Sequence, residues 1–180
     1  MNEIRSIPEL YACALAIERE AAERYAEFAQ RMADLGNDAV AEVFASLAGF
    51  ESSHLDELER RTRGVELPPP PASGWRWLEN DAAEPAAREL VYRVMTPRHA
   101  LEIALAAEKR AQAFFEGTLM RAGDPAVEAL AREMAAEEQE HVAMVERLLD
   151  RTPAPVDWAA LFDAAAKAGT LPSRPSRRAS

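Results

Sequence analysis

The segment VFASLAGFESSHLDEL, residues 43–58, places Glu51 and His54 in line with an apolar helical stripe. Side chains three residues apart in a helix project from the same face. The segment EEQEHVAMV, residues 137–145, repeats this arrangement with Glu138 and His141. A carboxylate and an imidazole are costly inside an apolar core, so both pairs need a partner that stabilises them there.

Two single glutamates complete an internal repeat. Glu18 lies 33 residues before the glutamate of the first Glu-x-x-His pair, and Glu108 lies 30 residues before that of the second. Each begins the pattern Glu-x-x-Ala-x-x-x-aromatic, which ends at Tyr25 in the first half and at Phe115 in the second. Each half of the chain therefore supplies one glutamate and one Glu-x-x-His pair.

The apolar periodicity predicts an all-α protein with four long helices. Their expected ranges are residues 8–35, 38–63, 97–122 and 125–151. Ser6, Thr96 and Asp124 are expected to cap three of these helices, because each stands where a side-chain oxygen can accept from the first turn. Short turns join the first helix to the second and the third to the fourth, so each pair should be an antiparallel hairpin.

A long crossover, residues 64–96, is expected to join the two hairpins and to contain a short helix near residues 85–95. Two helical hairpins joined in this way have the connectivity of a ferritin-like four-helix bundle. We expect the bundle to occupy residues 1–152. The remaining residues, 153–180, should add a short helix at about 157–168 and a flexible tail rich in proline, serine and arginine.

Composition narrows the possible partners and surroundings. The net charge of −10 argues against nucleic acid, which needs a basic face. No apolar run approaches the ~20 residues that span a membrane. The single cysteine, Cys13, cannot form a disulfide within the chain, and the first ten residues lack a basic-then-apolar targeting segment. We therefore expect a protein of the reducing cytoplasm.

The expected site combines four carboxylates with two imidazoles. The predicted metal ligands are Glu18, Glu51, His54, Glu108, Glu138 and His141. Four carboxylates neutralise two divalent iron ions, and oxygen with imidazole nitrogen suits iron, although manganese or zinc can occupy such a site. A single Glu-x-x-His in a glutamate-rich helix is weak evidence. Two pairs matched by two single glutamates in the same helical phase make coincidence a poor explanation.

Tyr25 is the predicted catalytic residue outside the ligand set. It lies two helical turns from Glu18 on the same stripe. A tyrosine in this place is either a plain core residue or a donor of a hydrogen bond or an electron to the metal site.

On these residues the chain resembles the rubrerythrin-like branch of the ferritin-like superfamily, over about residues 8–150. The resemblance implies two bound irons, a dimer, and reduction of peroxide or dioxygen. There is no rubredoxin-type domain, so a separate protein would donate the electrons. Rubrerythrins carry a further glutamate one turn from the ligand of the third helix, where this chain has Leu105 and Ala111.

Two other functions stay open at the level of sequence. The first is iron binding with ferroxidase activity, for iron handling or storage without peroxidase turnover. The second is a helical interaction module whose site is vestigial, although the intact ligand set argues against it.

Overall fold

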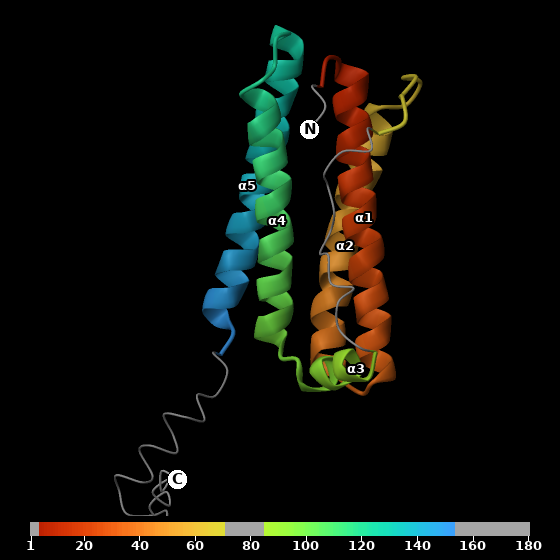
Figure 1. Cartoon of the computed structure of the whole chain (residues 1–180), viewed down its shortest axis with the longest axis vertical. Helices are drawn as coiled ribbons and strands as arrows, with labels where there is room; N and C mark the ends of the chain where they lie inside the picture. The colour runs from red at the N-terminus through yellow and green to blue at the C-terminus, as the bar shows by residue number, and fades with distance from the viewer. Residues whose placement is uncertain (1–3, 71–84, 154–180) are drawn as a thin grey trace, which may run out of the picture.

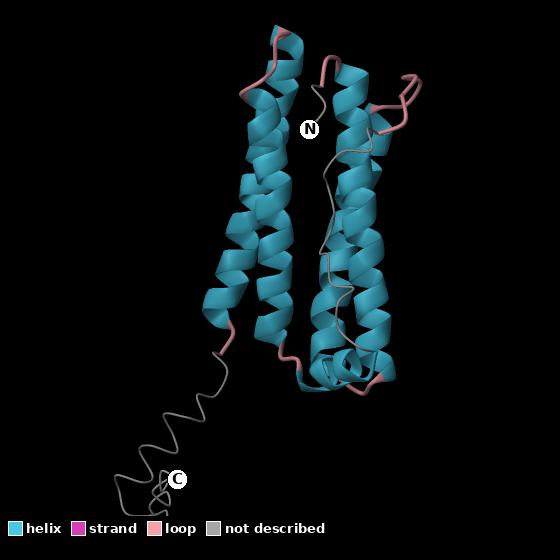
Figure 2. Ribbon diagram, viewed as in Figure 1, coloured by secondary structure: helices cyan, strands magenta, loops and turns pink. Residues whose placement is uncertain are grey.

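The computed structural model describes residues 4–70 and 85–153, and these form helices joined by short segments (Figure 2). In chain order the helices are α1 (Ile7–Asp34), α2 (Asp38–Arg61), α3 (Pro85–Val94), α4 (Pro97–Leu119) and α5 (Pro125–Arg151). Figure 1 shows α1 beside α2 as one hairpin, and α4 with α5 as a second. The predicted all-α, ferritin-like bundle is confirmed.

Side-chain caps start three of the four long helices. The Oγ atom of Ser6 accepts from the backbone N–H of Glu9, and the Asp124 carboxylate accepts from that of Ala126. At α4 the cap is reciprocal, because Thr96 accepts from the N–H of His99 while the His99 ring accepts from the N–H of Thr96. These bonds satisfy N–H groups that have no partner inside a helix.

The short helix α3 lies across the end of the first hairpin, where α1 turns into α2 (Figure 1). The turn itself uses Gly36, whose φ of 72° is the left-handed conformation that glycine adopts without strain. The side-chain amide of Asn37 then donates to the carbonyl oxygens of Tyr92 and Met95, at 3.1 and 2.9 Å. One side chain thus ties the first hairpin to the crossover that leads into α4.

The core consists of two apolar clusters with a polar layer between them. One cluster includes Ala14, Ile17, Leu58 and Met134, and the other includes Val145 among its buried members. All four long helices contribute to both clusters. On each helix the predicted ligands fall between the residues of one cluster and those of the other, so the bundle surrounds the site with apolar packing at both ends.

The helix ends differ slightly from the sequence predictions. Helix α2 ends at Arg61 and not at residue 63, and α4 ends at Leu119 and not at residue 122. After α4, the N–H groups of Arg121 and Ala122 bond to carbonyls three residues earlier, so the chain tightens into a turn before Gly123. The predicted helix at 157–168, the tail that follows it, and Trp75 and Trp77 lie outside the described residues.

Within the described ranges, no helix has both the length and the apolar character needed to cross a membrane.

Replacing Asn37 by alanine should destabilise the bundle by about 1–2 kcal/mol, because two part-buried carbonyls lose their donor. The side chain of Asn37 makes no capping hydrogen bond to α2. The loss of stability in this variant therefore measures the two hydrogen bonds that join the hairpin to the crossover. Urea denaturation would measure the change. As a control, Gln30→Ala removes an exposed hydrogen bond to Asp34 and should alter the free energy of unfolding by less than about 0.5 kcal/mol. Equal stability of both variants would contradict the expectation.

Candidate metal centre

Four helices each place an acidic side chain in the polar layer. The carboxylates are almost completely buried, with exposed fractions of 8% for Glu18, 2% for Glu51, 4% for Glu108 and 3% for Glu138. His141 is buried to the same degree, and His54 is half-buried. Charged side chains are rarely buried in this way unless they are paired or bind a metal.

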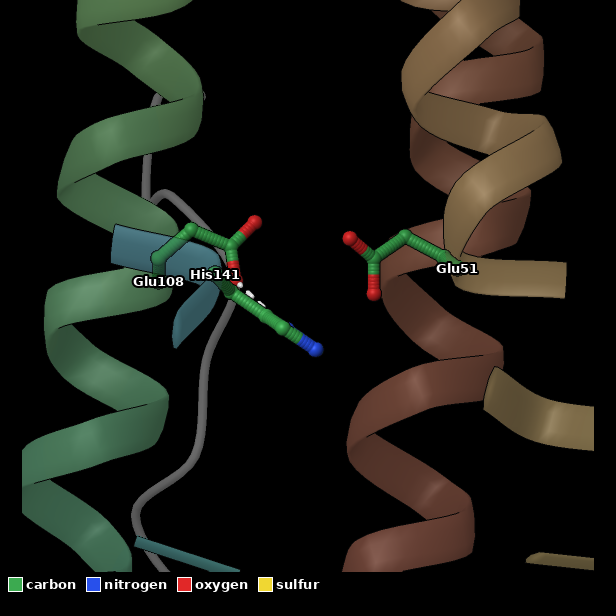
Figure 3. Close-up of side chains that lie close together, drawn as sticks. All are labelled: Glu51, Glu108 and His141. Carbon is green, nitrogen blue, oxygen red and sulfur yellow. Dashed lines mark ion pairs between the residues drawn. The ribbon is translucent and has the colours of Figure 1, made fainter. Parts of the chain in front are cut away.

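Three of these residues come together at the centre of the site. One ligand atom each from Glu51, Glu108 and His141 lie within 4.8 Å of one another. Figure 3 shows Glu51 reaching from α2 toward Glu108 on α4, with the His141 ring just below the gap between the two carboxylates. The Nδ1 atom of His141 lies 3.5 Å from Glu108 Oε2 and 3.6 Å from Glu138 Oε2. The remaining carboxyl, that of Glu18, lies beside that of Glu51, and each of the two carboxyls shifts the pKa of the other.

A small cavity separates the carboxylates. Its lining contains Glu18, Glu51, Glu108 and Glu138 together with apolar side chains, which are Ile17, Ala21, Ala107 and Ala111. Three of the four apolar residues are alanines, whose short side chains leave room beside the carboxylates. The alanine of each Glu-x-x-Ala repeat therefore lines the cavity, a role that the sequence pattern alone did not indicate.

The two histidine rings lie against each other on another side of the site. Their centroids are 4.4 Å apart, and the rings meet edge to face at 67°. Phe50 contacts both of them, with centroid distances of 4.5 Å to His54 and 4.9 Å to His141. The Glu-x-x-His motifs of α2 and α5 therefore contact each other through their histidine rings.

Tyr25 is fully buried and contacts the site directly. Its Oη atom donates a hydrogen bond to Glu108 Oε1 at 3.3 Å, across the bundle from α1 to α4. Burial, and then the negative charge of Glu108, raises the pKa of Tyr25 well above its ordinary value. The phenol therefore stays protonated and remains a donor.

The crowding of carboxyl groups opposes their ionisation. Burial raises the pKa of Glu18, and burial with the charge of Glu108 raises the pKa of Glu51 to about 11. Burial and the charges of Glu18 and Glu108 raise the pKa of Glu138 well above its ordinary value. Without a cation, several of these groups would hold protons at neutral pH, as like charges in one site require.

The two histidines respond differently to the same surroundings. Burial lowers the pKa of His54, and the neighbouring His141 lowers it further. Burial also acts to lower the pKa of His141, but Glu108 and Glu18 outweigh it, so the net shift is upward. His54 is therefore the more readily neutral of the two imidazoles.

Burial shows which of the three glutamates just before His141 faces the site. Glu138 is buried, Glu140 is exposed, and Glu137 is half-buried with a carboxylate oxygen 3.5 Å from an Arg61 nitrogen. The structure therefore brings together the six side chains that the sequence singled out, and it places Glu137 beside them in an ion pair.

The donor set fits a metal. Glu51 Oε1 and both ring nitrogens of His141 are buried and make no hydrogen bond in the described part of the chain. Buried polar atoms without partners are rare, and a site that binds a metal ion is one established reason for them. Four carboxylates and two imidazoles provide the oxygen and nitrogen ligands that first-row divalent metals accept.

Sequence reasoning did not find Phe50. It directly precedes Glu51, and no motif of the sequence gives it a role. A signal was available, because Phe50 and His54 are four residues apart and therefore adjacent on the helix surface. Its contact with His141 depends on how α2 and α5 approach each other, which no local pattern specifies.

The fold and the site together define a ferritin-like helical bundle with a buried cluster of carboxylates and imidazoles at its centre. The Rubrerythrin family model matches residues 9–149, and the chain belongs to this family. The chain is also similar to the crystal structure of an uncharacterized conserved protein from Magnetospirillum magnetotacticum MS-1. The two are 35% identical, with a TM-score of 0.66, over 84% of this chain and 98% of the other. No curated protein matches.

Raising the pH should destabilise the metal-free protein. A group whose pKa is raised by folding contributes stability that is fully present below its unfolded pKa and is lost as the pH rises toward its folded pKa. For Glu51 this window runs from 4.5 to about 11. We expect the urea midpoint of the metal-free chain to fall through this range.

The variant Glu51→Gln, which cannot ionise, should show a smaller fall in the midpoint over the same range. Glu42→Gln, on the exposed side of the same helix, should behave as the unaltered chain does. Three identical pH profiles would show that the buried carboxyl does not govern the stability of the metal-free protein.

Proposed function

We propose that the chain is a diiron oxidoreductase that reduces peroxide or dioxygen with electrons from a pair of ferrous ions. The observation that carries the proposal is the convergence of Glu51, Glu108 and His141 within 4.8 Å in a buried layer. Membership of the Rubrerythrin family, which suggests iron, adds independent support.

The proposed ligands are Glu18, Glu51, His54, Glu108, Glu138 and His141. Their four carboxylates would balance the charges of two ferrous ions, and bound iron would supply the two electrons that reduce an O–O bond. Each hairpin provides half of the ligands, so binding would depend on both hairpins being docked. Manganese or zinc could occupy the same ligands without supplying those electrons.

Other residues of the chain would orient the ligands and exclude water. Tyr25 donates to Glu108 and so fixes one carboxylate at a defined rotation. The apolar clusters on either side of the layer keep bulk water from the carboxylates, which strengthens the electrostatic interactions within the site. We propose Tyr25 as a proton or electron donor to the site, because its hydroxyl group contacts the proposed ligand Glu108.

Metal analysis tests the ligand assignment. The chain should bind two irons, and Glu51→Ala or His141→Ala should reduce the content well below two, because each removes a ligand from the centre. Glu140→Ala is the matched control, since Glu140 belongs to the same motif and is exposed. Elemental analysis after anaerobic loading with ferrous iron would measure the content. Two irons in both site variants would refute the assignment.

Tyr25→Phe tests the role of the phenol. Iron content should be unchanged, whereas oxidation of the ferrous protein by peroxide should slow by about tenfold, as expected for losing one hydrogen bond to a charged group. Stopped-flow absorbance would measure the rate. Tyr92→Phe provides the control, because Tyr92 packs against Phe28 away from the ligands. An unchanged rate in Tyr25→Phe would leave Tyr25 as a core residue only.

The second candidate is iron handling by a ferroxidase without peroxidase turnover. It is favoured by Ala111, which lines the cavity, and by Leu105, which packs on the core, at positions where rubrerythrins carry a further glutamate. Oxidation rates with dioxygen and with peroxide discriminate the two activities. The mass of the protein in solution also distinguishes the two functions, because a large hollow particle would favour iron storage and a dimer would favour the redox enzyme.

The oxidoreductase proposal includes a homodimer and a separate electron-donor protein as partners. It also places the protein in the reducing cytoplasm, where the buried thiol of Cys13 would remain free.

A further inference from the structure

Across the part of the chain that the structure describes, His141 lacks the hydrogen-bond partner that usually orients a metal-binding histidine. Such a histidine commonly donates its second ring N–H to a carboxylate, a carbonyl or water, which fixes the ring. In the described residues neither ring nitrogen of His141 makes a hydrogen bond. The nearest carboxylate oxygens, on Glu108 and Glu138, belong to proposed ligands themselves.

Phe50 occupies the place where such support is needed. Its ring is tilted by 55° to that of His54 and stands at 73° to that of His141, so both histidines pack on one phenyl group. The contact to His54 is within α2, and the contact to His141 crosses to α5. Together with the direct contact between the histidines, each of the three rings touches the other two.

This three-ring group is confined to one side of the site. The cavity between the carboxylates has no aromatic side chain in its lining. The phenyl ring therefore packs on the imidazoles without lining the space between the carboxylates, although His141 itself lies within 4.8 Å of Glu51 and Glu108. His54 is half-buried, so on this side the site comes nearest to solvent.

We propose that Phe50 is a positioning residue that clamps His54 and His141 against each other and keeps water from their rings. Packing against Phe50 orients the imidazoles, which is the role that a polar hydrogen-bond partner would otherwise have. The inference rests on the proposed function, because it concerns the two histidines as metal ligands. It adds a requirement that no ligand motif contains, namely an aromatic side chain immediately before Glu51.

Cobalt binding to the full chain tests this proposal. Phe50→Leu keeps an apolar side chain of similar bulk but removes the flat ring. We expect it to bind Co²⁺ about tenfold more weakly, the lower end of the effect of losing support behind a metal ligand. Phe50→Tyr restores a ring and should bind as the unaltered chain does. The Co²⁺ absorption bands would report affinity and geometry in an anaerobic titration.

A matched control separates clamping from general loosening of the bundle. Phe114 is another half-buried phenylalanine, which meets Phe115 edge to face at a centroid distance of 5.1 Å and packs against the apolar cluster beside the site. Phe114→Leu should leave cobalt affinity unchanged. Equal weakening in the two leucine variants, or failure of Phe50→Tyr to restore affinity, would overturn the proposal, as would unchanged affinity in Phe50→Leu.

Histidine-labelled protein without metal gives a second readout. The chain has three histidines, and the third, His99, caps α4 and serves as an internal reference. In Phe50→Leu the ring N–H signals of His54 and His141 should exchange faster with water, while those of His99 stay constant. Unchanged exchange at both rings contradicts the clamp. If the unaltered chain binds no Co²⁺, the proposed function fails, and this measurement still decides the role of Phe50.

Discussion

Four carboxyl groups share one buried layer, and the electrostatic cost of that arrangement governs the rest of the structure. Glu51 shows the cost most clearly, because its surroundings shift its pKa to about 11. A fold can keep such groups inside only if its packing elsewhere is sufficient and if a cation or protons compensate the charge. The two apolar clusters supply the packing at both ends of the layer, and the alanines beside the carboxylates leave a small cavity between them.

The sequence was enough to predict the bundle and the residues at its centre. Helical phase placed Glu51 and His54 on the buried face of α2, and the repeat located Glu138 among several neighbouring glutamates. These inferences succeed because a helix has a fixed period, so a polar residue in the apolar stripe must face the core. The caps at Ser6, Thr96 and Asp124 were predictable for a similar reason, since their chemistry is local.

What the sequence did not predict depends on how helices approach one another. The hydrogen bond from Tyr25 to Glu108 crosses the bundle, and the contact of Phe50 with His141 joins two hairpins. Both are set by the rotation and spacing of helices far apart in the chain. The end of α4 was misplaced for a different reason. The predicted end at residue 122 is wrong because the chain leaves the helix through a turn that begins after Leu119.

The pairing of Tyr25 with Glu108 has a consequence for the symmetry of the molecule. The two hairpins are built on one repeat, yet the residue equivalent to Tyr25 in the second hairpin is Phe115, which is equally buried and has no hydroxyl group. Glu108 therefore receives a hydrogen bond that the corresponding phenyl ring cannot offer to Glu18. The two halves of the site are therefore chemically inequivalent, although the hairpins that build them share one repeat, and a ligand bound between them would meet a different carboxyl environment on each side.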